Sequence, residues 1–468
     1  MLSLPAKDYR LPAAIPLLAC LYLPFIGGGF LTDDFAHVEH LTRIDSAARI
    51  VDSPDAFGFY RPVTQASIAL DLALHGPRPA RLRVLNVVLH ACVIGLAFVV
   101  ARLVFVNPLA AGLATLAFAL TPKAHPVAVL WISARAELLM SAFSLVAVAA
   151  WIVWTRNGRL AWLLGAAGAY LLALLSKETA TLLPILLLFT PGSPRAWKSR
   201  AAAAALLCGL AVAIYAWRAH IGALTPFSGD AHYDVMTGAS RWVRSLQNYT
   251  GRMIAAPLGL TLLLLAARSV EKRWADRTGA AGAGGTHSIM GNLFVFPLAW
   301  VIAFLAPVLP IVARSELYLY LPVFGVCLLA GLLARALIGN VVPQRTIALV
   351  ISMYVFALGA YQVARGIEFH RDLVFSEKLV EAFRHSPDVG TYEGTAVLVP
   401  ADATTERFLR DSIGGYLHLV LRQALGSARV TGTVHYQGEA QRPAGLRLLC
   451  EYRDGEVRLT RALTSPAR

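Results

Sequence analysis

Charged residues are scarce in this chain. Asp, Glu, Lys and Arg make up 15% of the 468 residues, whereas 57% are hydrophobic and the mean hydropathy is +0.59. Soluble globular domains carry about 25% charged residues, so the composition excludes an ordinary soluble domain and indicates a chain solvated by lipid. The formal net charge of +14 is then expected from Lys and Arg on cytoplasmic loops rather than from a nucleic-acid surface.

Cysteine and metal-binding patterns are also sparse. Four of the five cysteines fall in hydrophobic runs and the fifth, Cys450, stands alone, which excludes a disulfide scaffold and a Cys-based metal site. No two histidines have the His-x-x-x-His spacing of a helical metal site. We expect no obligatory metal cofactor, although a pair of Asp residues is able to hold Mg²⁺ or Mn²⁺ through its oxygens.

Long apolar runs, in contrast, are abundant. A helix needs about 20 mostly apolar residues to cross the hydrocarbon core, and on that basis about eleven spans are predicted. They lie near 11–30, 84–106, 108–122, 134–154, 160–175, 179–190, 201–217, 249–267, 289–311, 317–335 and 345–363. No signal-peptide cleavage pattern follows the first run, so we expect it to be retained as a span.

The loops between these runs predict the orientation. The segments "TRNGR", "PGSPRAWKSR", "RSVEKRWADR" and "RALIGNVVPQR" are short and net basic, as cytoplasmic loops are. The opposite ends of the spans, with the longer loops 31–83 and 218–248, are then on the outer face, which is the periplasmic face if the membrane is a bacterial inner membrane. The stretch "FYRPVTQASIALDLALHG" in the first loop suits a helix in the membrane interface.

The composition changes near residue 365. We therefore divide the chain into a transmembrane domain, 1–365, and a small α/β domain on the outer face, 366–468. Residues 366–385 have an amphipathic helical pattern, and "GTAVLVP", "RVTGTVHY", "GLRLLCEY" and "EVRLT" are typical of strands. Asp402 is placed to cap one helix whose apolar face includes Phe408 and Leu421. The predicted fold class is an α-helical polytopic membrane protein with a small C-terminal α/β domain.

Ionisable residues gather at the predicted outer ends of the spans. A charge at the middle of a span costs about 2.5–3.5 kcal/mol, so such residues indicate a functional site that faces a wet cavity. Structural roles are the alternative: Asp caps helices, Arg and Lys snorkel or form ion pairs, and Tyr lies in aromatic belts. The set is Asp33, Asp34, Tyr60, Arg61, Arg135, Glu137, Lys177, Glu178, Arg314, Glu316 and Tyr318.

Carboxylates and cations beside lipid suit one kind of chemistry, the transfer of a group from a phosphate-linked donor to a hydroxyl. A carboxylate takes the proton of the attacking hydroxyl as a general base. The cations hold the phosphate and stabilise the charge that grows on it as it leaves. The apolar tail of such a donor would lie between the helices.

The order of several motifs makes a family resemblance specific. They are "LTDDF", "YRPVTQASIALDLALHG", "RVLNVVLHACV", "VLWISARAELL", "LLALLSKETA" and "ELYLYLP", which together cover residues 15–335. With them the chain resembles the C-type (GT-C) glycosyltransferase superfamily, and within it the transmembrane O-mannosyltransferases that carry tetratricopeptide repeats, with their bacterial relatives. The resemblance implies that the donor is a polyprenyl-phosphate sugar and that an acidic pair in the first outer loop contains the catalytic base. It also implies inversion at the anomeric carbon.

Carried over by position, the resemblance assigns roles to the outer residues. Asp33 or Asp34 would be the base, and Arg61, Arg135 and Lys177 would be candidates for the donor phosphate. The wider substrate-binding set is Tyr60, Arg61, His125, Arg135, Glu137, Lys177, Glu178, Arg314, Glu316 and Tyr318.

The chain also departs from the family pattern. Leu317 stands where relatives usually have Arg, Val127 stands where an acidic residue is expected, and the repeats are absent. The sugar, with mannose as one candidate, and the acceptor, which is a glycan, a lipid or a protein, therefore stay open. A transporter or flippase of lipid-linked sugars is the alternative function, but it predicts charges at mid-depth and an internal repeat.

Overall fold

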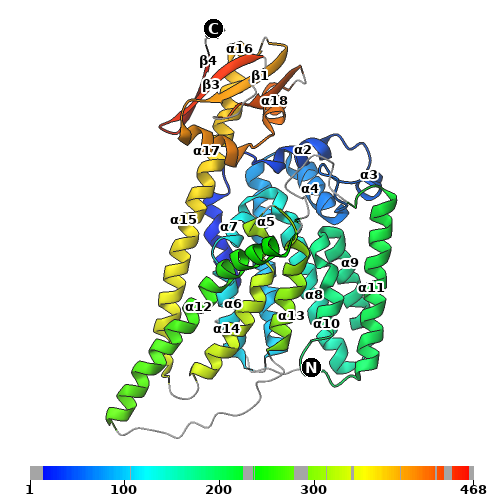
Figure 1. The fold of residues 1–468 in the computed structure, drawn as a ribbon, viewed down its shortest axis with the longest axis vertical. Helices are drawn as coiled ribbons and strands as arrows, with labels where there is room; N and C mark the ends of the chain where they lie inside the picture. The colour runs from blue at the N-terminus through cyan, green and yellow to red at the C-terminus, as the bar shows by residue number, and fades with distance from the viewer. Residues whose placement is uncertain are drawn as a thin grey trace.

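The structure is a computed structural model, and it describes residues 14–105, 107–224, 236, 238–278, 294–312, 314–338, 342–390, 392–426, 429–436 and 445–462. The side chains of 274–278 are outside this description. Figure 1 shows a helical bundle with a small α/β unit at one end. We call that end of the bundle the site end.

The bundle is that of a multi-pass membrane protein. In the described part of the chain, six helices are long and apolar enough to cross a membrane, with mean hydropathies of 1.7 to 2.5. They are α5 (Pro79–Val104), η3 with α8 (Ile132–Asn157), α11 (Trp197–His220), α12 (Ala239–Thr278), η8 with α14 (Glu316–Ile338) and α15 (Gln344–His385).

The remaining apolar helices are broken or short. The pair α6 (Pro108–Ala119) and α7 (Ala124–Leu130) passes the same test together, but bends by 67°. Four shorter elements are η2 (Ile15–Phe25), α9 (Leu160–Ser176), η4 with α10 (Glu178–Leu187) and α13 with η7 (Val295–Val308). Each of the predicted spans matches one of these elements in position.

The first of the two loops predicted to be outer, 31–83, folds into helices that cover the site end. They are α2 (Asp33–Thr42), α3 (Ala47–Asp52) and α4 (Pro62–His75), and Figure 1 shows them on top of the bundle, with α2 nearest the α/β unit. The predicted interfacial helix is α4, which starts with Pro62 at its first position. Of the second outer loop, 218–248, residues 225–235 and 237 lie outside the described residues, and α12 already begins at Ala239.

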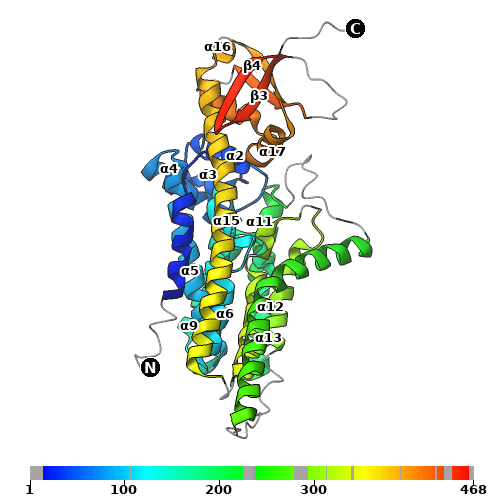
Figure 2. The same ribbon diagram turned by 90° about the vertical axis from the view of Figure 1, so that its left-hand side faces the viewer.

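Helix α15 joins the bundle to the α/β unit. It is one continuous helix of 42 residues, about 63 Å long at 1.5 Å per residue. It contains both the span predicted at 345–363 and the amphipathic helical segment predicted at 366–385. Figure 2 shows it running from the far end of the bundle up into the α/β unit. Met353 and Phe356 are exposed in its lower half, whereas Leu373 and Phe383 are buried in its upper half.

The α/β unit is built on a four-stranded sheet of order β2-β1-β3-β4. The central strand β1 (Gly394–Pro400) pairs in parallel with β2 (Val430–Val434) and β3 (Leu446–Arg453), and β3 pairs antiparallel with β4 (Glu456–Arg461). All four predicted strands are present. A short helix, α16 (Pro387–Gly390), links α15 to the sheet.

Two helices, α17 (Ala403–Ser412) and α18 (Leu417–Leu425), pack against the sheet where one helix was predicted. Asp402 caps α17, since its Oδ1 accepts a hydrogen bond from the backbone N–H of Thr405 at 2.7 Å. The helix then ends, and α18 begins after a turn in which Gly414 has φ +50°. The apolar periodicity runs through both helices, so periodicity alone did not reveal the break.

Candidate active site

The chain enters the site end through the glycines that precede Asp33. Gly28 has φ +91°, and a Cβ placed there would lie 2.6 Å from the Cβ of Leu373 on α15. Only glycine fits this close approach. The contact holds the start of the first outer loop against α15, directly before the two adjacent aspartates.

Asp34 is fully buried and acts as an anchor. Its Oδ1 accepts hydrogen bonds from the backbone N–H and the hydroxyl of Ser133, at 2.8 and 2.7 Å, and its Oδ2 accepts one from the N–H of Leu31 at 3.2 Å. Burial raises the pKa of this carboxyl, and it outweighs the nearby Arg83 guanidinium and the hydrogen bonds, which lower the pKa. The carboxylate therefore ties α2 to the η3–α8 junction.

Arg83 fixes the same loop from below. Its side chain is buried, and it donates hydrogen bonds to the carbonyl oxygens of Leu130 at 2.8 Å, Ile26 at 3.1 Å and Gly28 at 3.3 Å, and to that of Gly29. The sequence analysis did not place Arg83 in the site. The available signal was an arginine at the head of an otherwise apolar helix.

Asp33, in contrast, is only half-buried. It is the first residue of α2, where the helix dipole favours a negative charge. The hydroxyl of Tyr416, from the turn before α18, donates a hydrogen bond to its Oδ1 at 3.0 Å. Of the two adjacent aspartates, Asp33 is the more exposed.

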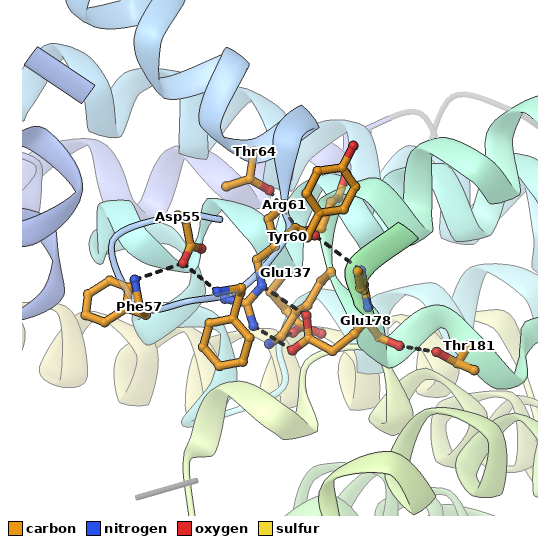
Figure 3. Close-up of polar contacts among 12 residues, drawn as sticks. Asp55, Phe57, Tyr60, Arg61, Thr64, Glu137, Glu178 and Thr181 are labelled. Carbon is orange, nitrogen blue, oxygen red and sulfur yellow. Dashed lines mark hydrogen bonds and ion pairs between the residues drawn. The ribbon is translucent and has the colours of Figure 1, made fainter. Parts of the chain in front are cut away.

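A second group of predicted residues forms paired charges. The guanidinium of Arg61 binds Glu178 with two hydrogen bonds, of 3.0 Å from Nε to Oε2 and 2.5 Å from Nη2 to Oε1. Lys177 Nζ binds Glu137 Oε2 at 2.6 Å and lies 5.1 Å from the centre of the Tyr318 ring. Figure 3 shows Arg61 and Glu178 pointing toward each other with Glu137 beside them.

The loop before Arg61 is held by Asp55, which the sequence analysis did not select. Asp55 Oδ1 accepts hydrogen bonds from the backbone N–H groups of Phe57 and Phe59, each at 2.9 Å (Figure 3). The Phe59 ring lies 3.9 Å below the Arg61 guanidinium. The carbonyl of Tyr60 accepts a hydrogen bond of 3.3 Å from Arg218 of α11, so the loop that presents Arg61 is fixed at several points.

Arg135 is fully buried, and all three of its guanidinium nitrogens are engaged. Nη2 lies 2.8 Å from Asp71 Oδ2 and donates to the carbonyl of Leu82 at 2.7 Å. Nε donates to Asn86 Oδ1 at 2.9 Å, and Nη1 to the carbonyl of Ser67 at 3.1 Å. This arginine joins α4, α5 and α8.

His125 lies in a buried aromatic cluster. Its ring centre is 4.7 Å from that of His90 and 5.0 Å from that of Tyr320, and the Tyr320 hydroxyl lies 2.6 Å from His90 Nδ1. His125 itself is fully buried. The structure thus places it within the bundle, behind the turn that carries Lys123.

Three cations surround Glu316. Its carboxylate lies 3.0 Å from Arg365 Nη2, 3.8 Å from Arg252 Nη1 and 3.9 Å from Lys123 Nζ. The three cations are 28%, 28% and 38% exposed, so the group is open to solvent. We call these three cations with Glu316 the cation cluster.

The cation cluster draws on four distant segments. Lys123 lies between α6 and α7 with φ +75°, in a turn closed by the N–H of Ala124 donating to the carbonyl of Pro122 at 3.0 Å. A positive φ is strained for lysine, and strain of this kind gathers at functional sites. The predicted residue Arg314 is exposed nearby in sequence, before η8.

Comparison with known proteins establishes the fold. No family model matches the chain, and no curated protein matches it either. ArnT from Cupriavidus metallidurans bound to undecaprenyl phosphate aligns with a TM-score of 0.51 at 13% identity, covering 96% of this chain and 94% of ArnT. Apo ArnT aligns with a TM-score of 0.50 at 12% identity, covering 92% and 86%. ArnT is a glycosyltransferase of the GT-C superfamily.

The chain has the GT-C fold. The oligosaccharyltransferase of Archaeoglobus fulgidus in its apo form gives a TM-score of 0.49 at 11% identity, covering 91% of this chain and 64% of that enzyme. Asp33, Glu137, Glu178 and Glu316 each lie in the first turn of a helix. Lys123 lies in the turn between α6 and α7, whereas Arg252 and Arg365 lie inside α12 and α15.

Several of the predicted residues meet in the structure, and cations that were not predicted join them. The structure brings Arg61 to Glu178, and Lys177 to Glu137 and Tyr318. It surrounds Glu316 with Lys123, Arg252 and Arg365, none of which the sequence analysis selected. In the described part of the chain, no group of three or more His, Cys, Asp or Glu side chains is placed to hold a metal ion.

Proposed function

We propose that this protein is a membrane glycosyltransferase that moves a sugar from a polyprenyl-phosphate donor to an acceptor hydroxyl on the outer face of the membrane. The observation that carries the proposal is the placement of a half-buried carboxylate, Asp33, at the same end of the bundle as an excess of cations around Glu316. A GT-C fold like that of ArnT, which has been crystallised with undecaprenyl phosphate, supports it. Mannose is one candidate sugar.

Asp33 is the general base in this proposal. It takes the proton of the acceptor hydroxyl, the hydroxyl oxygen attacks the anomeric carbon, and the bond from that carbon to the phosphate oxygen breaks. The leaving group is polyprenyl phosphate, and attack from the face opposite to it inverts the configuration. Asp34 is a poor candidate for the base because its carboxylate is buried and already binds Ser133 and Leu31.

The cation cluster holds the donor phosphate in this proposal. Three cations face two carboxylates there, Glu316 and Glu368, so one positive charge is left over for an added anion. Charge-assisted hydrogen bonds to phosphate oxygens are strong, and they strengthen as charge grows on the leaving group. Arg314 is exposed and available to add a further contact. The reaction written in this way requires no divalent cation.

The remaining predicted cations have a positioning role in the proposal. Arg61 and Lys177 are each neutralised by a carboxylate, and Arg135 uses its donors within the protein. We therefore assign these three residues to fixing the helix ends around the substrate. Tyr60, His125, Glu137, Glu178 and Tyr318 belong to the same framework.

The test uses purified protein in lipid nanodiscs with a panel of polyprenyl-phosphate sugars, with and without cell-envelope extract as a source of acceptors. Release of free polyprenyl phosphate with one donor, together with transfer of its sugar to an acceptor, is the expected result. A donor that binds tightly, stays intact with extract present and exchanges between the leaflets of a liposome would instead support the flippase alternative.

A further inference from the structure

The α/β unit packs directly on the first outer loop. One hydrophobic cluster contains Phe30, Phe35 and Leu41 of the loop together with Phe375 of α15 and Leu417 of α18, all buried. Both Figure 1 and Figure 2 show α2 beneath the unit. The unit therefore has a fixed position over the segment that carries Asp33.

A backbone hydrogen bond joins the two parts at the residue before Asp33. The N–H of Thr32 donates to the carbonyl of Ser412, at the end of α17, at 2.8 Å. Thr32 has φ +36°, a conformation that a β-branched residue adopts only when its surroundings impose it. The Ser412 hydroxyl in turn donates to the carbonyl of Asp372 on α15 at 3.0 Å, so Ser412 is itself held.

Tyr416 completes the contact through its side chain. Its hydroxyl donates to Asp33 Oδ1 at 3.0 Å, and its ring meets that of Phe57 edge to face, with centres 6.4 Å apart. Six residues further along the chain, on α18, Arg422 forms an ion pair with Glu39 of α2. Both ends of α2 are thus joined to α18, which restricts movement of Tyr416 relative to Asp33.

We propose that the turn 412–416 of the α/β unit is part of the active site and that Tyr416 is a positioning residue for Asp33. This inference rests on the proposed function, in which Asp33 is the base. A carboxylate at a helix start rotates about two side-chain torsions. A hydroxyl that holds one of its oxygens sets the direction in which the carboxylate meets the acceptor hydroxyl, and proximity of this kind is a large part of catalysis.

The inference gives the α/β unit a role in the reaction. The acceptor must reach Asp33 beside residues 412–416, so the unit forms one wall of the acceptor's approach. The donor phosphate, on the cation cluster of the bundle, does not depend on it. Changes at Tyr416 are therefore expected to alter turnover of the bound complex and to leave donor binding unchanged.

The test compares Tyr416→Phe with wild type and with Tyr452→Phe, a matched control. Tyr452 lies in the same unit but packs against Phe375 and Phe408. We expect Tyr416→Phe to lower kcat about tenfold, the usual weight of a hydrogen bond to a charged group, with an unchanged KM for the donor. Tyr452→Phe is expected to keep the wild-type kcat.

Two results would overturn the inference, and both differ from failure of the proposed function. Unchanged kcat in Tyr416→Phe while Asp33→Asn is inactive would overturn only the positioning role. An equal loss of kcat in Tyr416→Phe and Tyr452→Phe would also overturn only the positioning role. Full activity of Asp33→Asn, or no turnover by wild type, would count against the proposed function instead.

A second measurement does not depend on turnover. Amide hydrogen exchange at residues 32–37 is expected to be faster in Tyr416→Phe than in wild type, and unchanged in Tyr452→Phe. Equal exchange in all three proteins would contradict a coupling between Tyr416 and the Asp33 segment.

Discussion

Asp34 accepts two hydrogen bonds from Ser133, a residue 99 positions away, through its backbone N–H at 2.8 Å and its hydroxyl at 2.7 Å. The adjacent Asp33 meets Tyr416 instead and is half-buried. Two neighbouring carboxylates thus have different surroundings, which supports an anchoring role for one and a chemical role for the other.

Asp34→Asn is expected to lower the thermal stability of the protein. The amide keeps an oxygen for Ser133 but turns an N–H group toward the N–H of Leu31, and an unsatisfied buried donor costs about 1–3 kcal/mol. The melting temperature in nanodiscs measures this, with the half-buried Asp33→Asn as the matched control that changes it less. If Asp34→Asn kept the wild-type melting temperature but lost turnover, Asp34 rather than Asp33 would be the base.

His37 predicts how stability depends on pH. Burial, with smaller contributions from Arg61 and His40, lowers the pKa of His37 to about 3, against about 6.5 in an unfolded chain. Between these values the unfolded state binds the proton and the folded state does not, so stability falls as the pH is lowered from about 6.5 toward about 3. The expected slope is up to about 1.4 kcal/mol per pH unit.

Denaturation of the wild type and of His37→Phe over this pH range measures the effect. The variant is expected to show a shallower slope because it lacks the titrating ring. His385→Gln, at an exposed histidine, serves as the control. Identical slopes in His37→Phe and wild type would show that His37 does not resist protonation in the folded state.

Arg365→Gln is expected to weaken the binding of undecaprenyl phosphate. Arg365 makes the shortest contact with Glu316 in the cation cluster, 3.0 Å, and a hydrogen bond to a charged group is worth about 1.5–3 kcal/mol, roughly a tenfold or larger change in Kd. Arg384→Gln, at an exposed position of the same helix, is the control. An unchanged Kd, or an equal change in the control, would place the phosphate elsewhere.

Arg135→Ala is expected to destabilise the fold rather than to weaken donor binding. Its removal leaves the buried Asp71 carboxylate without its partner at 2.8 Å, and breaking a buried pair costs about 3–5 kcal/mol. The yield of monodisperse protein and its melting temperature measure the loss, with the exposed Arg159→Ala as control. If Arg135→Ala were stable but no longer bound the donor, Arg135 would be a residue that binds the donor phosphate.

The sequence predicted the membrane architecture because long apolar runs report burial in lipid directly. It also predicted the strands and the Asp402 cap, which depend on local patterns. It did not predict that α15 runs past Gly366 without a break. A Cβ at Gly366 would lie 2.4 Å from the Phe25 ring, so this glycine serves the packing of η2 on α15, a contact that no local pattern reveals.

The site was predictable in part for the same reason. Aspartates after a first span and charges at span ends stand out against an apolar background, so Asp33, Arg61, Lys177 and Glu316 could be selected as candidates. Lys123, Arg252 and Arg365 lie on three different elements and meet only around Glu316. Whether they meet depends on how the α6–α7 turn, α12 and α15 pack, and in sequence they resemble ordinary interfacial cations.

The most direct test of the account is turnover of Asp33→Asn beside Asp34→Asn, with the donor identified from the panel and each protein in nanodiscs. The account predicts that Asp33→Asn loses at least about a hundredfold in kcat, as expected for a general base, while its Kd for the donor stays at the wild-type value and folded Asp34→Asn still turns over. Full release of polyprenyl phosphate by correctly folded Asp33→Asn would contradict it.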